Sequence, residues 1–427
     1  MSSEQTYQLT PPANWADAEA RLKNADWHAA SIVQQVFAAF AASGEECRAI
    51  GGAVRDTLLS RPVNDLDFST TAIPDVAARI VREAGFTVHE TGLAHGTITA
   101  ARDGAAYEIT TLRADVETDG RHATVAFTTD WSVDAARRDF TINAFSCDRD
   151  GKLYDPVGGF VDLAAGRVRF IGDATARIRE DRLRILRFFR FSGRYARGAL
   201  DAEAYAAIAE EKSGLEHLSA ERVRAELVRL LITPRAADVV VAMAGLGLFE
   251  IVLGRSVQPE IFSALVELEA THAITPEPMR RLSALMASMS SRDVADLQKR
   301  LRLSRQEADH LRALSRAATD LSAKTGGDPT IGVALYEHGA PAIRDGVLLV
   351  AANDPNACTG LARRLAEAQA WQKPEFPLDG SDLIAAGFEP GPALGVELAR
   401  IEDAWIASVF TLSVEELRRM IRSPSDD

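Results

Sequence analysis

One stretch of this chain, IGGAVRDTLLSRPVNDLDF at residues 50–68, constrains the possible fold more than any other. Its Gly-Gly pair predicts a turn where the backbone can approach a ligand, because glycine has no Cβ. A short amphipathic helix carrying Arg55 follows, and Asp65 and Asp67 then stand at the head of an apolar segment. Residues two apart on a strand point to the same face. Mg²⁺ takes one or two carboxylates and leaves its other positions to water and phosphates, so the stretch predicts a nucleoside triphosphate held with a metal.

The composition indicates an ordinary multi-domain protein. A chain of 427 residues is long enough for two to four domains, and its hydrophobic share of 47% is typical of globular proteins. Its three cysteines are far apart, so they suggest neither a disulfide framework nor a zinc site. We expect a cytoplasmic protein without membrane contact, because the sequence shows no secretory signal and no apolar run of about 20 residues.

The net charge of −13 argues against a nucleic-acid partner, but the distribution of charge matters more than its sum. Between residues 169 and 197, nine arginines stand against three acidic residues. Such a local basic stripe can bind phosphates on an acidic protein, and the binding should then depend on salt.

The combination of GG-x-V-R-D, eight intervening residues and D-L-D resembles the signature of nucleotidyltransferases of the DNA polymerase β superfamily. Within it, the chain is similar to the branch that holds bacterial tRNA nucleotidyltransferases (CCA-adding enzymes) and bacterial poly(A) polymerases. The resemblance implies an α+β fold: a polymerase-β-like nucleotidyltransferase head with a small mixed sheet, followed by an all-α neck, body and tail. It also implies that Gly52 and Arg55 contact the incoming nucleotide, and that Asp65 and Asp67 hold Mg²⁺.

Two predicted strands after this stretch add a further carboxylate. Asp103-Gly104 between them is a strong two-residue hairpin signal. Glu108, in the second arm, could face the two aspartates as a third catalytic carboxylate, because the family has one on a neighbouring strand. The alternative is an exposed strand glutamate without a catalytic role. The polar section at 113–131 resembles the family's flexible loop.

The block RRDFTINA at residues 137–144 also matches the family closely. By that match, Arg138 contacts the sugar or phosphates of the nucleotide, and Asp139 and Asn143 brace the site. Without the resemblance, the two arginines would be interpreted as a solvated pair at the start of a helix.

The segment EDRLRILRFFR at residues 180–190 predicts how a base is chosen. A single helix would place Asp181 and Arg184 on one face, with Arg187 and Arg190 at further steps of three. A carboxylate only accepts hydrogen bonds and arginine only donates them. The first two residues therefore fit the amino group and ring-nitrogen acceptor of cytosine or adenine, and they reject guanine and uracil. At about 1–3 kcal/mol per bidentate contact, the discrimination reaches roughly a hundredfold.

The resemblance assigns Asp181 and Arg184 to base recognition, with Arg187 and Arg190 supporting base and phosphate. The alternative is an amphipathic helix whose charges are simply solvated.

The resemblance is strong over residues 45–235 and fainter beyond. It predicts four parts: a catalytic nucleotidyltransferase head (1–165), a helical neck with the nucleotide-selecting helix (166–235), a helical body (236–328) and a helical, tRNA-binding tail (329–427). The implied reaction is template-independent addition of CMP and AMP (CCA) to the 3′ end of tRNA from CTP and ATP, with release of pyrophosphate.

Three alternatives stay open: a poly(A) polymerase, an enzyme that adds only CC or only A, and a catalytically idle RNA-binding protein. The stretch HETGLAHGTITA is of the CCA-enzyme type, which disfavours the first. The eight histidines show no clustered metal-ligand pattern in the sequence, so we expect no phosphohydrolase domain of the HD type.

Overall fold

The structure, a computed structural model, describes residues 9–93, 96–118, 123–287, 289–323, 331–354, 356 and 360–422. The centre of the predicted flexible loop, residues 119–122, lies outside them. The chain divides into two compact units, with the boundary between Gly254 and Arg255. The four-part division made from the sequence is finer than these units and stays a prediction.

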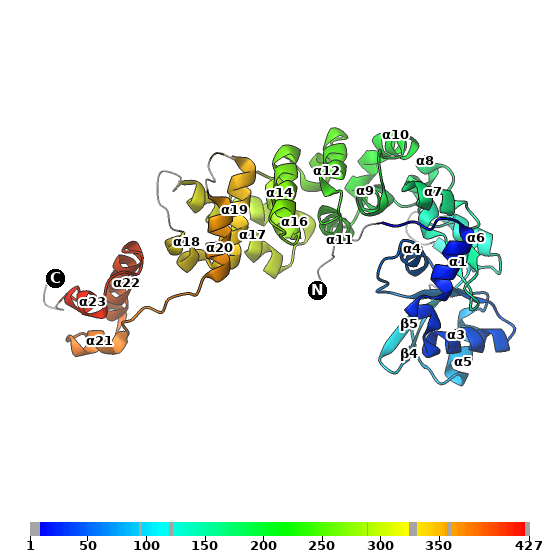
Figure 1. Cartoon of the computed structure of the whole chain (residues 1–427), viewed down its shortest axis with the longest axis horizontal. Helices are drawn as coiled ribbons and strands as arrows, with labels where there is room; N and C mark the ends of the chain where they lie inside the picture. The colour runs from blue at the N-terminus through cyan, green and yellow to red at the C-terminus, as the bar shows by residue number, and fades with distance from the viewer. Residues whose placement is uncertain are drawn as a thin grey trace. The chain divides into compact units, whose positions relative to one another are not determined.

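The first unit contains a seven-stranded mixed sheet (Figure 1). Its strands are β1 (Cys47–Ile50), β2 (Asp67–Thr70), β3 (Thr87–Gly92), β4 (Thr97–Arg102), β5 (Ala105–Thr111), β8 (Ser146–Cys147) and β9 (Leu153–Tyr154). They lie in the order β3-β4-β5-β2-β1-β8-β9, and among these neighbours only β2 and β5 run parallel. A separate hairpin is formed by β6 (Arg113–Thr118) and β7 (Ala123–Phe127). The predicted small mixed sheet is confirmed.

The sheet places the end of β1 and the beginning of β2 beside the middle of β5, where the glycine turn and the carboxylates lie. The core behind β2 is apolar: Phe68 is fully buried, and its ring lies 5.4 Å from that of Phe37 on α3 (Ser31–Ala42). The predicted hairpin between β4 and β5 is confirmed. Its two turn residues, Asp103 and Gly104, have φ of 51° and 80°, values that aspartate and glycine adopt more readily than most residues.

Helices surround the sheet and continue the unit. Those near the sheet are α1 (Trp15–Lys23), α2 (Asp26–Ala29), α4 (Gly52–Leu58), α5 (Pro74–Glu83), α6 (Trp131–Ala136) and α7 (Gly159–Ala165). Those that follow are α8 (Ala174–Glu180), α9 (Arg184–Tyr195), α10 (Ala202–Glu211), α11 (Ala220–Leu231), α12 (Ala236–Gly245) and α13 (Leu248–Leu253).

The helix predicted to carry both Asp181 and Arg184 is in fact two helices. Asp181 has extended backbone angles (φ −148°, ψ 105°) between α8 and α9, so the two residues do not share one helical face, and that expectation is wrong. The break has a local cause. The Asp181 carboxylate accepts a hydrogen bond from the backbone N–H of Leu183 at 3.0 Å, and aspartate favours such local bonds over continued helix.

The described part of the second unit is helical. Its helices are α14 (Pro259–Thr271), α15 (Pro278–Leu285), α16 (Ser291–Leu301), α17 (Arg305–Ala323), α18 (Gly332–His338), α19 (Ala340–Asn353), α20 (Leu361–Ala370), α21 (Gly380–Ala385), α22 (Pro392–Ala407) and α23 (Val414–Arg419). Buried apolar residues such as Ile343 and Ile401 form its cores. Among the described residues, no helix combines the length and apolar character of a membrane span.

Candidate active site

A cavity of about 810 Å³ in the first unit collects almost all of the predicted site residues. It is lined by five aspartates (Asp56, Asp65, Asp67, Asp139 and Asp181) and nine arginines (Arg55, Arg113, Arg137, Arg138, Arg184, Arg187, Arg190, Arg194 and Arg229). Of the ten predicted site residues, only Glu108 is not in the lining. The excess of arginine makes the cavity suited to a polyanion, although the whole chain is acidic.

Three carboxylates converge at the sheet. β2 begins at Asp67, whose partner in the parallel register is Glu108 on β5. Partial loss of hydration and the repulsion from Glu108 and Asp65 raise the pKa of Asp67, and Arg138 opposes this shift. Within the described part of the chain, none of the three carboxylates forms an ion pair. Such a group is costly until a cation is bound, which favours a divalent metal there.

The glycine turn lies beside these carboxylates. Gly51 has φ of 64°, a value that strongly favours glycine. The chain then enters α4, where the Arg55 side chain is almost fully buried. Arg55 donates to both Asp56 oxygens at 3.0 and 3.1 Å and to the Asn143 side chain. It therefore lines the cavity as a fixed positive charge.

The block of residues 137–144 is bonded to α9. Asp139 is buried and accepts from the Asn143 amide at 2.9 Å and from the Arg187 guanidinium at 2.5 Å. Burial alone would raise the pKa of Asp139, but Arg187 and Asn143 outweigh it and lower that pKa. Arg187 also lies 3.6 Å from Glu226, which binds Arg190 at 2.5 Å. Both arginines therefore line the cavity while paired with carboxylates.

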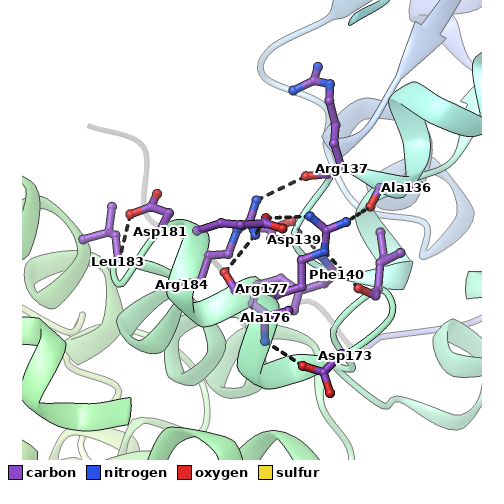
Figure 2. Close-up of polar contacts among 12 residues, drawn as sticks. Ala136, Arg137, Asp139, Phe140, Asp173, Ala176, Arg177, Asp181, Leu183 and Arg184 are labelled. Carbon is purple, nitrogen blue, oxygen red and sulfur yellow. Dashed lines mark hydrogen bonds and ion pairs between the residues drawn. The ribbon is translucent and has the colours of Figure 1, made fainter. Parts of the chain in front are cut away.

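Asp181 and Arg184 both line the cavity, and the backbone N–H of Arg184 donates to the Asp181 carbonyl at 3.0 Å, while their side chains have other partners. The second Asp181 oxygen accepts from Arg222 at 2.7 Å. The Nη1 atom of Arg184 donates to Glu180 at 2.6 Å and to the Arg177 carbonyl at 2.9 Å, and Nη2 donates to the Arg137 carbonyl at 3.2 Å (Figure 2). Since arginine has five N–H groups, these three bonds leave two N–H groups for a ligand.

Several residues that line the cavity were not predicted from the sequence. Arg194 and Tyr195 continue the arginine side of α9, so the spacing along that helix could have indicated them. Arg229 comes from α11, and no motif in the sequence connects it to the site.

Two groups in the second unit each bring one histidine to two carboxylates: Glu277, His310 and Asp345, and Asp320, Glu337 and His338. The sequence showed no such clustering. In the first group, Asp345 is already bonded to Arg280 at 2.8 Å. The expectation of no HD-type domain stays a prediction.

Comparison with known proteins identifies the family. Residues 47–169 match the poly A polymerase head domain, and residues 199–265 match the probable RNA and SrmB-binding site of polymerase A. The mitochondrial CCA tRNA nucleotidyltransferase 1 of Danio rerio is 37% identical over 375 residues, which are 87% of this chain and 86% of the relative. The chain belongs to the CCA tRNA nucleotidyltransferase family.

Bacterial members of the CCA tRNA nucleotidyltransferase family match as well. A CCA-adding enzyme of Geobacillus thermodenitrificans is 39% identical over 207 residues, covering 48% of this chain and 50% of the relative. The crystal structure of the Bacillus stearothermophilus CCA-adding enzyme in complex with CTP has a TM-score of 0.71 at 27% identity, covering 91% of this chain and 95% of that one. These matches confirm the predicted α+β fold and the predicted enzyme class. They support the family, and not a bacterial branch within it.

Proposed function

We propose that this protein adds CMP and AMP to the 3′ end of tRNA without a nucleic-acid template, using CTP and ATP and releasing pyrophosphate. One observation carries the proposal: a single cavity is lined by the two aspartates of the D-L-D motif and by the Asp181 and Arg184 side chains, among nine arginines. The tRNA 3′-hydroxyl attacks the α-phosphate, and pyrophosphate leaves from the opposite side.

Asp65 and Asp67, with Glu108 behind them, would hold Mg²⁺ in this proposal. The donor set fits, because desolvation and the repulsion from Glu108 and Asp65 raise the pKa of Asp67, and a bound cation would relieve that repulsion. The bound metal would lower the pKa of the attacking hydroxyl and neutralise charge on the leaving group. Arg138 lies close enough to oppose the shift of Asp67, so it is placed to bind the phosphates or ribose of the nucleotide.

Base selection is assigned to Asp181 and Arg184. Each Asp181 oxygen has a second lone pair, because each is bonded once to Leu183 or Arg222. The carboxylate can therefore accept from the amino group of cytosine or adenine while an unused N–H of Arg184 donates to the ring nitrogen. Uracil and guanine present an N–H at that ring position, so donor meets donor. Arg187 and Arg190 support the base and phosphates from the next turns of α9, and Gly52 with Arg55 completes the nucleotide site.

The tRNA is assigned to the remaining helices. Duplex RNA is recognised mostly by shape and backbone contacts, and the helical body and tail proposed from the sequence supply such a surface. We also propose a cytoplasmic enzyme of the bacterial type; fractionation of the source cell tests the first point.

One experiment tests the proposal against its rivals. Purified protein is incubated with tRNA lacking its 3′ end, Mg²⁺ and CTP alone, ATP alone, or both, and the products are resolved on a sequencing gel. Stepwise products of two and then three added nucleotides support CCA addition. A long ladder with ATP alone indicates a poly(A) polymerase, and arrest after CC or after A indicates a partial enzyme. If the tRNA is not extended under any condition, the protein is an RNA-binding protein without this activity.

A further inference from the structure

The short helix α6 carries a buried carboxylate that faces away from solvent beside the active site. Asp134 is 3% exposed, and its two oxygens are bound by the two arginines that directly follow the helix. Arg137 donates to Oδ1 at 2.8 Å, and Arg138 donates to Oδ2 at 3.0 Å. Asp134 itself is not among the described residues that line the active-site cavity, whereas both arginines are.

The carboxyl end of the same helix is bound to the neck. The carbonyls of Ala136 and Arg137 stand at the end of α6, where a helix leaves its last carbonyls without intrahelical partners. They accept hydrogen bonds from Arg177 and Arg184, respectively. Figure 2 shows the Arg137 carbonyl directed at Arg184 while the guanidinium of Arg137 extends away from it. Arg137 therefore bonds to Asp134 through its side chain and to Arg184 through its backbone carbonyl.

The second arginine lies toward the catalytic carboxylates. Arg138 lowers the pKa of Asp67 against the effects of desolvation and of the neighbouring acids. Its Nη1 atom lies 3.4 Å from the position that a Cβ on Gly51 would occupy. Asp134 thus holds Arg138 next to the catalytic carboxylates. It also holds Arg137, whose carbonyl accepts a hydrogen bond from Arg184.

Helix α6 is anchored at its other end as well. Asp130 caps it by accepting from Ser132 at 2.8 Å. The Arg48 guanidinium lies between the rings of Trp131 and Tyr154, 4.0 and 3.6 Å from their centroids. A helix of only six residues is not stable by itself, so these contacts and Asp134 fix its place.

We infer that Asp134 is a positioning residue, which fixes the positions of Arg138 and Arg184 relative to each other. It thereby couples phosphate binding to base selection. The inference rests on the proposed function, because that function gives the two arginines their roles. Asp134 also accepts from the backbone N–H of Arg113 at 3.3 Å, where the β6–β7 hairpin begins. The Asp134 carboxylate therefore also fixes the first residue of the β6–β7 hairpin.

The charge of Asp134 is essential to this arrangement. Burial would raise its pKa, but Arg138 and Arg137 outweigh burial and lower it, so the group stays ionised throughout the physiological range. Asn in its place offers one acceptor oxygen and no charge. Its NH₂ group, a donor, takes the place of the second oxygen, so one of the two arginines loses its acceptor and is free to move.

The test is a double-mutant cycle on the full-length protein, with Asp134→Asn, Arg138→Gln and the combined variant. We expect Asp134→Asn to lower kcat/KM for CTP about 10- to 100-fold, the range for small misplacements of binding groups, and to reduce the preference for CTP over UTP. In the Arg138→Gln background, the same change should lower kcat/KM for CTP by a clearly smaller factor, because one of the two arginines that Asp134 holds is already gone, but it should still reduce the preference for CTP over UTP through Arg137 and Arg184. Asp134→Glu keeps the charge and should recover part of the loss.

A matched control and a second measurement separate this role from a merely structural one. Glu211 also holds two arginines of the first unit, Arg179 and Arg182, but none of the three lines the cavity. Glu211→Gln should keep kcat/KM and base preference within about twofold. Equal losses in both Arg138 backgrounds, or a lowered melting temperature with unchanged base preference, would overturn the inference.

Calorimetric titration with CTP, ATP and UTP separates the inference from the proposed function. If the wild-type protein binds CTP and ATP but adds neither to tRNA, the proposed function fails. The inference still stands or falls by whether Asp134→Asn weakens CTP binding and narrows the gap between CTP and UTP.

Discussion

The active-site cavity and the buried ion cluster of the second unit are built from the same residue types, yet they are organised differently. In the cluster, Arg280 is fully buried and bonds Glu269 at 2.7 Å and Asp345 at 2.8 Å, while Arg281 bonds the other Glu269 oxygen at 2.7 Å. These two buried arginines and two buried carboxylates balance in charge, and the half-exposed Arg344 adds a bond to Asp345 at 3.0 Å from the edge of the cluster. In the cavity, nine arginines stand against five aspartates.

The charges of the cluster therefore stabilise the fold, whereas the excess charges of the cavity are available to bind a ligand. A balanced buried cluster has little capacity left for another ion, and breaking it leaves an uncompensated charge. Among the residues that the structure describes, the cavity instead keeps Asp65 and Asp67 without an ion pair, and Arg184 with two N–H groups beyond its three bonds. Substitutions in the cavity should therefore act on catalysis, and those in the cluster should act on folding.

The largest effect is expected at the unpaired carboxylates. Asp67→Asn should reduce nucleotide incorporation at least about a thousandfold, since the metal it holds supplies several kcal/mol to the transition state. The folded protein should be no less stable, because the substitution removes the repulsion that raises the pKa of Asp67. Single-turnover incorporation and thermal melting measure the two effects. Asp103→Asn, an exposed carboxylate of the same sheet, is the control that keeps full activity; a well-folded, active Asp67→Asn protein would remove the metal site.

Next comes the cluster itself. Arg280→Met should lower the free energy of unfolding by about 3–5 kcal/mol, because Glu269 and Asp345 lose their shared buried partner. Urea denaturation followed by tryptophan fluorescence measures it. CTP binding by the folded protein should not change, because the cavity belongs to the first unit. Arg305→Met, at a side chain that is 95% exposed, should stay within about 0.5 kcal/mol of the wild type. Loss of CTP binding in folded Arg280→Met protein would contradict the separation of the two regions.

A smaller effect is expected for base choice. Arg184→Ala should reduce discrimination of CTP against UTP about 10- to 100-fold, which is the equivalent of roughly 1–3 kcal/mol for one bidentate contact. Competition assays with both nucleotides measure it. Arg179→Ala is the matched control, since Arg179 lies on the neighbouring helix α8 and pairs with Glu211 outside the cavity. Unchanged rejection of UTP by the Arg184 variant would show that another group selects the base.

The sequence was informative where function is local. The glycine turn, the D-L-D pair and the RRDFTINA block are short, and their backbones must adopt particular conformations, so their residues converge as expected. Asp67 and Glu108 are 41 positions apart, but a parallel register sets them side by side. That pairing could be inferred only through the family resemblance, because no local rule fixes strand register.

The features that could not be predicted from the sequence depend on contacts between residues that are far apart in the chain or on a single side-chain hydrogen bond. The helix break at Asp181 was missed because helical periodicity continues through it, while the competing hydrogen bond to Leu183 is a matter of one side chain. Arg229 and Asp134 were missed because nothing in their neighbourhood indicates which arginines or cavities they meet. The histidine clusters were missed because their members come from different helices: Glu277, His310 and Asp345 are separated by whole helices, and Asp320 on α17 meets Glu337 and His338 on α18.

The smallest effect is a pH dependence confined to the cluster. His310 lies between Asp345 at 3.4 Å and Glu277 at 3.9 Å, with Arg280 nearby. Its hydrogen bond to Asp345 raises the pKa of His310 above its ordinary value of 6.5, against desolvation. A group whose pKa is higher when folded stabilises the protein fully below its unfolded pKa and loses that contribution as pH rises through the folded pKa. The unfolding free energy of the wild type should therefore fall, by at most about 1 kcal/mol, as pH rises from below 6.5 past that raised pKa.

His310→Gln can still donate a hydrogen bond but does not titrate, so its urea denaturation midpoint should lack this component of the pH dependence. The active site offers the contrast, because a low pKa keeps two carboxylates ionised across the same interval: Asp139, which lines the cavity, and Asp134, which holds two of its arginines. CTP affinity should consequently show the same pH dependence in the wild type and in His310→Gln, although their stability profiles differ. Parallel pH profiles of unfolding and of CTP binding compare the two regions directly. An identical pH profile of stability in wild type and His310→Gln would mean that the histidine carries no charge-dependent part of the cluster.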